Sequence, residues 1–173
     1  MRLERASLAS PKGLQDFLIG LGDGENGFGG TPVHNGELSL QEYLQICCDM
    51  TDESNLKPGL VPQTVFWLLS SDDKVIGMVK VRHRLAASTR MNGGHIGFFI
   101  HPSYREKGYG KQALALALTE LKKIGELEAL ITVYSENKAS IRIVESNGGR
   151  YSDTVFDIRT KQWINRYRID LKP

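Results

Sequence analysis

One segment of the chain, residues 96–121, constrains the fold more than any other. An apolar run, Ile96–Ile100, is followed by a proline, by a turn with glycines at positions 108 and 110, and by a run of strong helix formers. This pattern predicts a strand, a turn and a helix. Such an arrangement suits a phosphate-bearing ligand, because free backbone N–H groups and the positive end of the helix dipole meet where the helix starts. Lys107 and Lys111 add positive charge nearby.

The length of the chain favours a single domain, and its near-neutral net charge provides no overall electrostatic field that would attract nucleic acid or a membrane. The chain has 173 residues, enough to bury one substantial core, and its Lys and Arg residues outnumber Asp and Glu only 22 to 20. Met1–Ser7 lacks the apolar core of a signal peptide, and no stretch reaches the length of a membrane span. We therefore expect one cytoplasmic domain over residues 1–173, with neither nucleic acid nor membrane as a partner.

The cysteines are Cys47 and Cys48. Adjacent cysteines rarely bridge each other, and no second pair is present to complete a zinc site. We interpret them as helix-packing residues, with a reactive thiol as the alternative, and we predict no metal site.

The first part of the chain predicts a strand over 2–7, a helix from Pro11 to Gly20, and a second helix capped by Ser39. The glycine-rich stretch 20–36 between the helices disfavours regular structure, so we expect a mobile loop. Within it, residues 22–27 match the dinucleotide pattern G-x-G-x-x-G. That pattern has meaning between a strand and a helix, whereas here a predicted helix precedes it, so we interpret the match as accidental.

The remaining sequence alternates between β-rich and helix-forming runs. The expected strands are 64–69, 75–82, 95–100, 129–134, 151–156 and 163–171, and the expected helices are 113–124 and 137–146. The element order is strand, two helices, three strands, helix, strand, helix and two strands, which predicts a mixed α/β (α+β) fold. Because the strands before the glycine turn form a predicted antiparallel meander, a doubly wound nucleotide-binding sheet is disfavoured.

This order and the turn motif resemble the GNAT acetyltransferase superfamily. Its acetyl-CoA motif is Arg or Gln, two residues, Gly, one residue, then Gly or Ala, and here it stands as Arg105-Glu-Lys-Gly108-Tyr-Gly110. The preceding strand ends in His101-Pro102, the following strand ends at Tyr134, and Asn137 opens the next helix, which leads to Asn147-Gly-Gly149. The resemblance covers the whole element order, and residues 94–149 carry its specificity as the acetyl-CoA-binding core.

The resemblance implies a mostly antiparallel central sheet, flanked by helices and splayed between its two central strands. It implies acetyl-CoA as cosubstrate, with glycines that let the backbone approach the pyrophosphate and a strand-end N–H that polarises the thioester carbonyl. For Asn137 an ordinary N-cap is a compatible alternative. The implied cofactor-binding residues are Phe99, Ile100, Arg105, Glu106, Lys107, Gly108, Tyr109, Gly110, Lys111 and Asn137.

Direct acetyl transfer to a primary amine in a ternary complex needs a neutral amine and usually a proton for the leaving thiolate. Many relatives carry a glutamate where this chain has His95, and histidine, with a pKa of about 6.5, suits a general base. On a strand His95 shares a face with Gly97 and Phe99, so we expect its ring on the acceptor side of the cleft. A strand-end histidine without a chemical role is the alternative. Glu136 and His101 are reserve candidates.

The proton donor departs from the family pattern. Many relatives have a tyrosine seven residues after the asparagine, where this chain has Val144. Tyr134, Tyr109 or water could replace it, because a thiolate leaves readily. The same departure motivates the alternative function, a non-catalytic or weakly catalytic acyl-CoA-binding sensor of the same fold.

Residues 20–50 lie where the family builds its acceptor wall. This region and its flank are acidic through Asp23, Glu25, Glu37, Glu42, Asp49, Asp52 and Glu53. The acidity suits a cationic amine, and a solvated face explains it equally well. Polyamines, amino sugars, amino acids and peptide amines therefore all stay open as acceptors, the loop could close over them as a lid, and a homodimer is also compatible.

Overall fold

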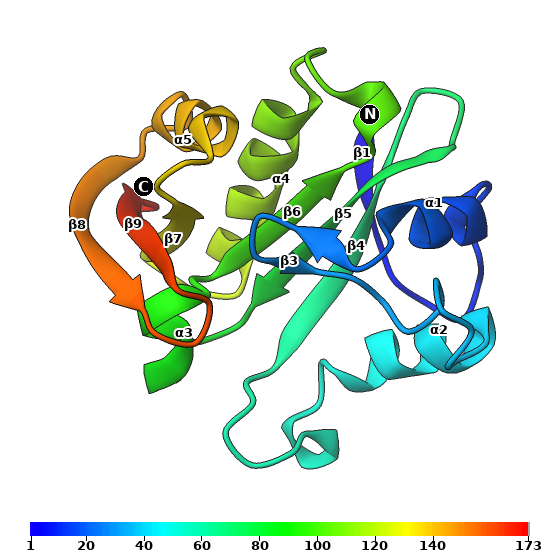
Figure 1. The fold of residues 1–173 in the computed structure, drawn as a ribbon. Helices are drawn as coiled ribbons and strands as arrows, with labels where there is room; N and C mark the ends of the chain where they lie inside the picture. The colour runs from blue at the N-terminus through cyan, green and yellow to red at the C-terminus, as the bar shows by residue number, and fades with distance from the viewer. Residues whose placement is uncertain (173) are drawn as a thin grey trace.

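The computed structural model describes residues 1–172 and confirms the mixed, mostly antiparallel fold (Figure 1). A four-stranded antiparallel sheet has the order β1 (Arg2–Arg5), β4 (Gln63–Leu69), β5 (Val75–Arg82) and β6 (Ile96–Ile100). Strands β4 and β5 are buried along most of their length, as their continuous apolar runs predict. Strand β6 pairs with β5 through one edge, so its other edge faces the second sheet.

The second sheet has three antiparallel strands. Their order is β7 (Glu128–Tyr134), β9 (Gln162–Asp170) and β8 (Arg150–Asp157). Strand β9 pairs with both neighbours, so β7 also keeps one edge without a β-ladder partner. Strands β6 and β7 therefore face each other across the junction of the two sheets.

Helices cover both faces of the sheets. They are α1 (Leu14–Leu21), α2 (Leu40–Asp49), α3 (Ala87–Asn92), α4 (Tyr109–Lys123) and α5 (Lys138–Glu145), with 3-10 turns at Glu53–Asn55 and Pro102–Tyr104. Helices α1 and α2 pack on one face of the larger sheet, α4 packs on the other, and α5 packs against α4 and β7. The capping box predicted at Ser39 forms with Glu42 at the start of α2.

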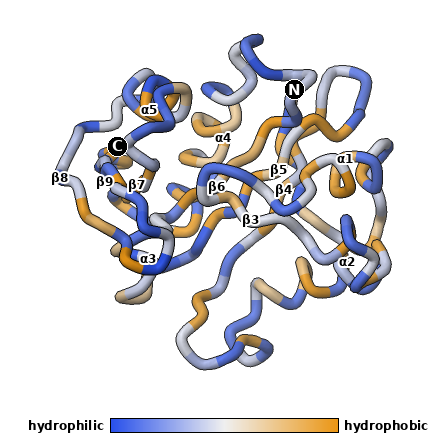
Figure 2. Tube along the Cα trace, viewed as in Figure 1, coloured by the Kyte–Doolittle hydropathy of each residue, from blue (hydrophilic) through white to orange (hydrophobic). Residues whose placement is uncertain are grey.

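Each face has its own apolar core. Leu114 and Leu121 of α4 share one cluster with buried residues of β6 and β7, and this cluster joins the two sheets on the α4 side. Leu14, Leu44 and Trp67 belong to the cluster beneath α1 and α2. Figure 2 shows apolar segments along the central strands and along α4. The two cores hold β6 from both sides, which fixes the strand that borders the site.

The sequence prediction for residues 20–36 was wrong, because part of this stretch is a β-hairpin. Strands β2 (Gly24–Glu25) and β3 (Phe28–Gly29) pair, and Asn26 and Gly27 both have positive φ, 50° and 85°. An Asn-Gly pair with positive φ is the preferred turn of a two-residue hairpin. The G-x-G-x-x-G match falls in this hairpin, which excludes the dinucleotide interpretation. The short helix α3 was also missed.

No helix within residues 1–172 is long and apolar enough to cross a membrane. The same residues hold no cluster of His, Cys, Asp and Glu side chains that could bind a metal ion. Cys47 is buried in the α1–α2 cluster, as predicted for a packing residue, and burial raises the pKa of its thiol to about 11.

Candidate active site

Strands β6 and β7 meet at one end and separate toward the other. At the closed end the backbone N–H of His95 donates to the Leu130 carbonyl at 2.8 Å, and the Leu130 N–H donates to His95 Nδ1 at 2.9 Å. A Cβ on Gly94 would lie 2.5 Å from the Leu130 oxygen, so only glycine allows this approach. Beyond this point the two strands form no ladder with each other, which matches the splay implied by the family resemblance.

A cavity of about 270 Å³ fills the gap between the strands, close to the lower end of the range for small-molecule sites. Its walls come from β5, β6, β7, β9, α3, the β2–β3 hairpin, the β8–β9 turn and the start of α5. The lining residues are Asn26, Gly27, Phe28, Gly29, Lys80, Arg82, Thr89, Asn92, Gly93, Ile96, Gly97, Phe98, Ile131, Thr132, Val133, Tyr134, Asn137, Ser140, Arg159 and Ile164. We call this cavity the cleft.

The β2–β3 hairpin lies over β6 on the side of α1 and α2 (Figure 1), and its residues 26–29 line the cleft. The ring of Phe28 lies over β6, where a Cβ on Gly97 would be 3.5 Å from it. At the turn, a Cβ on Gly27 would lie 3.2 Å from the Tyr134 ring on β7. The hairpin therefore reaches from one separated strand to the other. The Asn26-Gly27 dipeptide was the sequence signal that could have revealed it.

The cleft is lined by cations and by no carboxylate. Lys80, Arg82 and Arg159 are its charged lining residues. Lys80 and Arg82 are half-buried, and desolvation lowers the pKa of both. Arg82 donates from one terminal nitrogen to the carbonyls of Gly93 and Gly94, at 3.0 and 2.9 Å. The sequence places Lys80 and Arg82 two residues apart, but it does not show that Arg159 joins them in one cavity.

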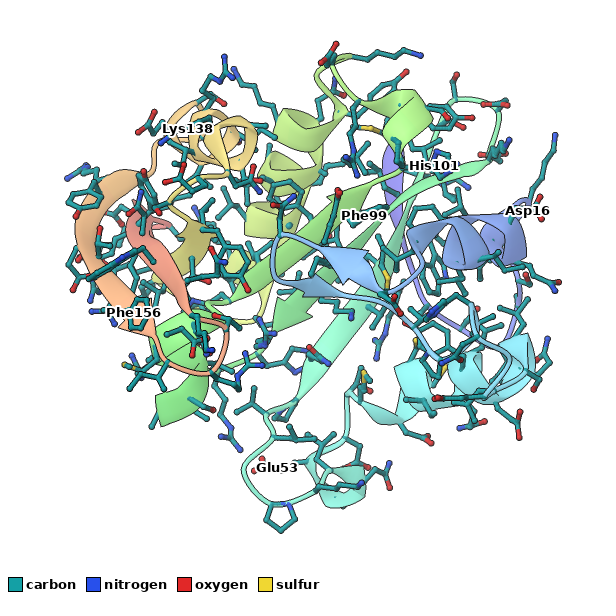
Figure 3. The ribbon with its side chains drawn as sticks, in the orientation of Figure 1. Asp16, Glu53, Phe99, His101, Lys138 and Phe156 are labelled. Atoms are coloured by element: carbon teal, nitrogen blue, oxygen red, sulfur yellow. The ribbon has the colours of Figure 1, made fainter. Side chains whose placement is uncertain are left out.

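The acidic residues predicted to form an acceptor wall lie outside the cleft lining. Glu42 caps α2, Glu53 pairs with Arg84, and the Asp23 side chain is 99% exposed. Figure 3 places Glu53 at the edge of the molecule, well away from Phe99 on β6. The solvated-face interpretation is therefore the one that fits the structure.

The start of α4 presents free backbone N–H groups. Gln112 donates to the Gly108 carbonyl at 3.2 Å, whereas the N–H groups of residues 106–111 have no acceptor within residues 1–172. Gly108 has φ of 78°, and a Cβ there would meet no atom within 4 Å. The region is thus open, positively polarised and flanked by the exposed Lys107 and Lys111, as the sequence predicted.

The other residues of the turn differ in role. Glu106 is exposed with φ of 61°, and Tyr109 stacks near Tyr104, with ring centroids 6.5 Å apart. A Cβ on Gly110 would lie 2.7 Å from Ile143 Cδ1, so this glycine serves the close packing of α4 against α5. The structure thus gives Gly110 a packing role, and the approach of its backbone to a ligand stays a prediction.

Arg105 turns toward β6 and the hairpin. Its Nε donates to the Ile100 carbonyl at 2.9 Å, its guanidinium lies 5.2 Å from the Phe99 ring centroid, and it forms an ion pair with Glu25 on β2. These contacts tie the end of β6 to the hairpin. The Arg105 side chain is thus engaged away from the free N–H groups of α4.

The β6 residues that line the cleft differ from those predicted to contact the cofactor arm, so that contact stays a prediction. Phe99 and Ile100 are buried in opposite cores and do not line the cleft. Residues 96–98 line it instead. The backbone groups on the free edge of β6 are therefore available to a ligand, whereas the Phe99 and Ile100 side chains are buried.

Asn137 lines the cleft and caps α5. Its Oδ1 accepts from the Ser140 N–H at 3.1 Å, which confirms the N-cap interpretation. Its position in the cleft wall keeps the cofactor contact as a prediction.

His95 is placed differently from the prediction. Its side chain is 8% exposed, its Nδ1 accepts the Leu130 N–H, and its Nε2 lies 3.8 Å from Glu126. Burial lowers the pKa of the imidazole. The ring is not part of the cleft lining, because its hydrogen bond to β7 holds it at the closed end. The prediction that the His95 ring lies on the acceptor side of the cleft is therefore wrong. No contact in the structure supports a catalytic role for His95.

Val144 occupies the usual tyrosine position and is fully buried. Because valine has no proton to donate, the usual general acid is missing there. Of the two substitutes proposed from sequence, Tyr134 lines the cleft and Tyr109 does not. Of the reserve bases, Glu136 and His101 also lie outside the cleft lining.

Together, the splayed strands and the free helix start define the class of acyl-CoA-dependent transferases with a mixed sheet. The acetyltransferase (GNAT) family profile matches residues 37–148, and the chain belongs to this family. Acetyl-CoA is the cosubstrate of the family. No curated protein sequence matches the chain at a significant level.

Solved structures share the fold at low sequence identity. A spermidine N-acetyltransferase SpeG variant from Vibrio cholerae is 16% identical with a TM-score of 0.67, over 99% of this chain and 95% of that one. A GNAT acetyltransferase from Streptococcus pneumoniae is 17% identical with a TM-score of 0.66, over 97% of both chains. The yncA acetyltransferase of Salmonella typhimurium, solved with acetyl-CoA, is 19% identical with a TM-score of 0.52, over 64% of this chain and only 65% of that one.

Proposed function

We propose that the protein transfers an acetyl group from acetyl-CoA to a primary amine in a ternary complex. The observation that carries this proposal is the row of free N–H groups at the start of α4, at the end of β6 that leads away from the closed end of the cleft. Membership of the acetyltransferase family supports the same activity.

The residues present fit acetyl-CoA. The N–H groups of residues 106–111 suit its pyrophosphate, and the open space at Gly108 leaves room for it. The facing edges of β6 and β7 carry unpaired backbone groups that can bind an extended arm as an added strand would be bound. Bound acetyl-CoA would supply an activated thioester whose acetyl carbon accepts the amine.

Within the cleft, Tyr134 is the phenol that can give a proton to the leaving thiolate. The hairpin, in particular Phe28 over Gly97, would keep water from the same space. No Asp, Glu or His lines the cleft within residues 1–172, so an incoming ammonium finds no carboxylate or imidazole there. We infer that the acceptor reacts as the free amine taken from solution, and that the rate rises with pH toward the pKa of that amine.

An acyl-CoA-binding sensor is the second candidate. Two observations favour it: Val144 replaces the usual proton donor, and His95 lies outside the cleft lining. A sensor would use the same helix start and the same strand edges. It would differ only in lacking turnover.

Two measurements distinguish the candidates. Acetyl-CoA binding is measured by calorimetry, and release of the coenzyme A thiol is then followed with a panel of amines that includes spermidine, the acceptor named for the SpeG relatives. Thiol release that depends on an amine supports the transferase. Tight binding of acetyl-CoA without thiol release in the presence of any amine supports the sensor. An absence of acetyl-CoA binding contradicts both candidates.

A further inference from the structure

Lys80 is a cation inside the cleft without an anionic partner. No carboxylate acts on its pKa, which burial lowers, and it takes part in no ion pair within residues 1–172. A half-buried ammonium that lacks a counter-ion is costly unless a ligand supplies one. The structure therefore places in the cleft an amine whose charged form an anionic ligand would stabilise.

The surroundings of Lys80 keep that charge in the cleft. Its Nζ lies 4.7 Å from the centroid of the Phe28 ring, in the geometry of a cation–π contact, under the hairpin. In the β5–β6 register Lys80 is opposite Gly97, which lines the cleft and carries no side chain to block it. The ammonium is thus reachable from the space where an acceptor would lie.

Arg82 adds a second positive charge on the same face of β5. Residues two apart on a strand share a face, so Lys80 and Arg82 both point to the cleft. Arg82 uses one terminal nitrogen for the Gly93 and Gly94 carbonyls, and no carboxylate acts on its pKa. By contrast Arg159 is paired with Asp157 at 3.6 Å. The excess positive charge of the cleft is therefore that of Lys80 and Arg82.

These cations lie too far from the helix start to serve the same phosphate groups. Lys80 is opposite Gly97, three residues before Ile100, a separation of about 10 Å along β6. Arg82, which donates its N–H to the His95 carbonyl, lies further toward the closed end. An anion at this end must belong to the other substrate.

We propose that the acceptor is an amine that also carries a carboxylate or phosphate group, and that Lys80 and Arg82 bind this group. The inference rests on the proposed transferase function and narrows its substrate class. It disfavours polycations such as spermidine, because their second charge would face two unpaired cations. Binding by Lys80 would place the anionic end of the acceptor at the closed end of the cleft.

The test uses pairs of amines that differ only in the anionic group. Amino acids are compared with their carboxamides, glucosamine 6-phosphate with glucosamine, and spermidine serves as the polycation. We expect at least one anionic member to give a kcat/KM at least about tenfold above that of its neutral partner, as charge-assisted hydrogen bonds would provide. The carboxylate and phosphate pairs identify which anion is used.

The variant Lys80→Gln tests the residue itself, and Lys57→Gln, which removes an exposed charge outside the cleft, is the matched control. We expect Lys80→Gln to raise KM for the anionic acceptor at least about tenfold and to leave KM for its neutral partner unchanged. The control should match the wild type. An equal fall of kcat for both members of a pair would show that Lys80 moves a proton instead, and would overturn the proposal.

Product binding gives a readout that needs no turnover. Calorimetry with coenzyme A present compares N-acetyl amino acids with their amides, and N-acetylglucosamine 6-phosphate with N-acetylglucosamine. Tighter binding of an anionic member, lost in Lys80→Gln, supports the proposal. Equal or weaker binding of every anionic member overturns it, whereas a failure to bind acetyl-CoA overturns the proposed function on its own.

Discussion

His95 joins the two sheets through its side chain. It accepts the buried Leu130 N–H, so His95→Ala leaves that donor without a partner and should lower the free energy of unfolding by about 1–3 kcal/mol. His95→Asn keeps an oxygen that can accept the bond and should lose less. Urea unfolding measures both variants. Full stability in both, together with lost turnover and a changed pH–rate profile, would restore the catalytic interpretation.

Tyr134 is the residue expected to move a proton. Replacing it with phenylalanine removes only the hydroxyl from the cleft wall, and we expect kcat to fall about tenfold to a hundredfold. The acetyl-CoA dissociation constant should stay the same, which calorimetry checks. Tyr109→Phe is the control, because Tyr109 lies outside the cleft lining. If both variants keep the full kcat, water supplies the proton.

At the scale of elements, the β2–β3 hairpin determines how closed the cleft is. Gly27 has φ of 85°, and a Cβ there would lie 3.2 Å from the Tyr134 ring, so Gly27→Ala should both strain the turn and loosen its contact with β7. We expect kcat/KM for the acceptor to fall several-fold while acetyl-CoA still binds.

Gly36→Ala is the matched control for that prediction. Gly36 has φ of 77°, and a Cβ there would meet no atom within 4 Å, so this variant carries the backbone strain without the contact. Steady-state kinetics on both variants separates the two effects. Equal losses in Gly27→Ala and Gly36→Ala would mean that the hairpin does not act on the cleft.

The long periodic elements could be predicted from the sequence because each one is locally specified. Strands β4 to β6 and helix α4 follow directly from their apolar patterns, and the turn between β6 and α4 follows from its glycines. The β2–β3 hairpin was missed because glycine density was given more weight than the Asn26-Gly27 turn. Helix α3 has no buried residue, so its sequence shows no apolar stripe.

The cleft was harder to predict because its chemistry comes from tertiary contacts. The strand face of His95 was predicted, but its hydrogen bond to Leu130 depends on how β7 meets β6. Lys80 and Arg82 become neighbours of the hairpin only in the folded chain. The sequence shows how many acidic residues lie near α2 but not where their side chains lie in the fold. A solvated face therefore explained them as well as an acceptor wall did.

At the scale of the whole molecule, one buried and two partly buried histidines link stability to pH. Burial lowers the pKa of His83, His95 and His101, so the unfolded chain binds protons at a higher pH than the folded protein does. The stability is fully present above about pH 6.5, the pKa of an exposed histidine, and is lost as pH falls toward the folded values.

Urea unfolding from about pH 8 to about pH 5 checks this linkage. We expect the free energy of unfolding to fall below about pH 6.5, and to fall less steeply in His95→Asn, which removes one of the three groups. A free energy of unfolding that stays constant or rises over this range would contradict the burial of these side chains.

The central claim is that one cleft brings acetyl-CoA and an amine together for direct transfer. Simultaneous measurement of thiol release and of the acetylated amine by mass spectrometry tests it most directly. We expect thiol release to require an amine, with one acetylated amine for each thiol, and we expect an amine carrying an anionic group to be used best. Thiol release that does not depend on an amine would contradict direct transfer. Binding of acetyl-CoA without thiol release in the presence of any amine would contradict it too.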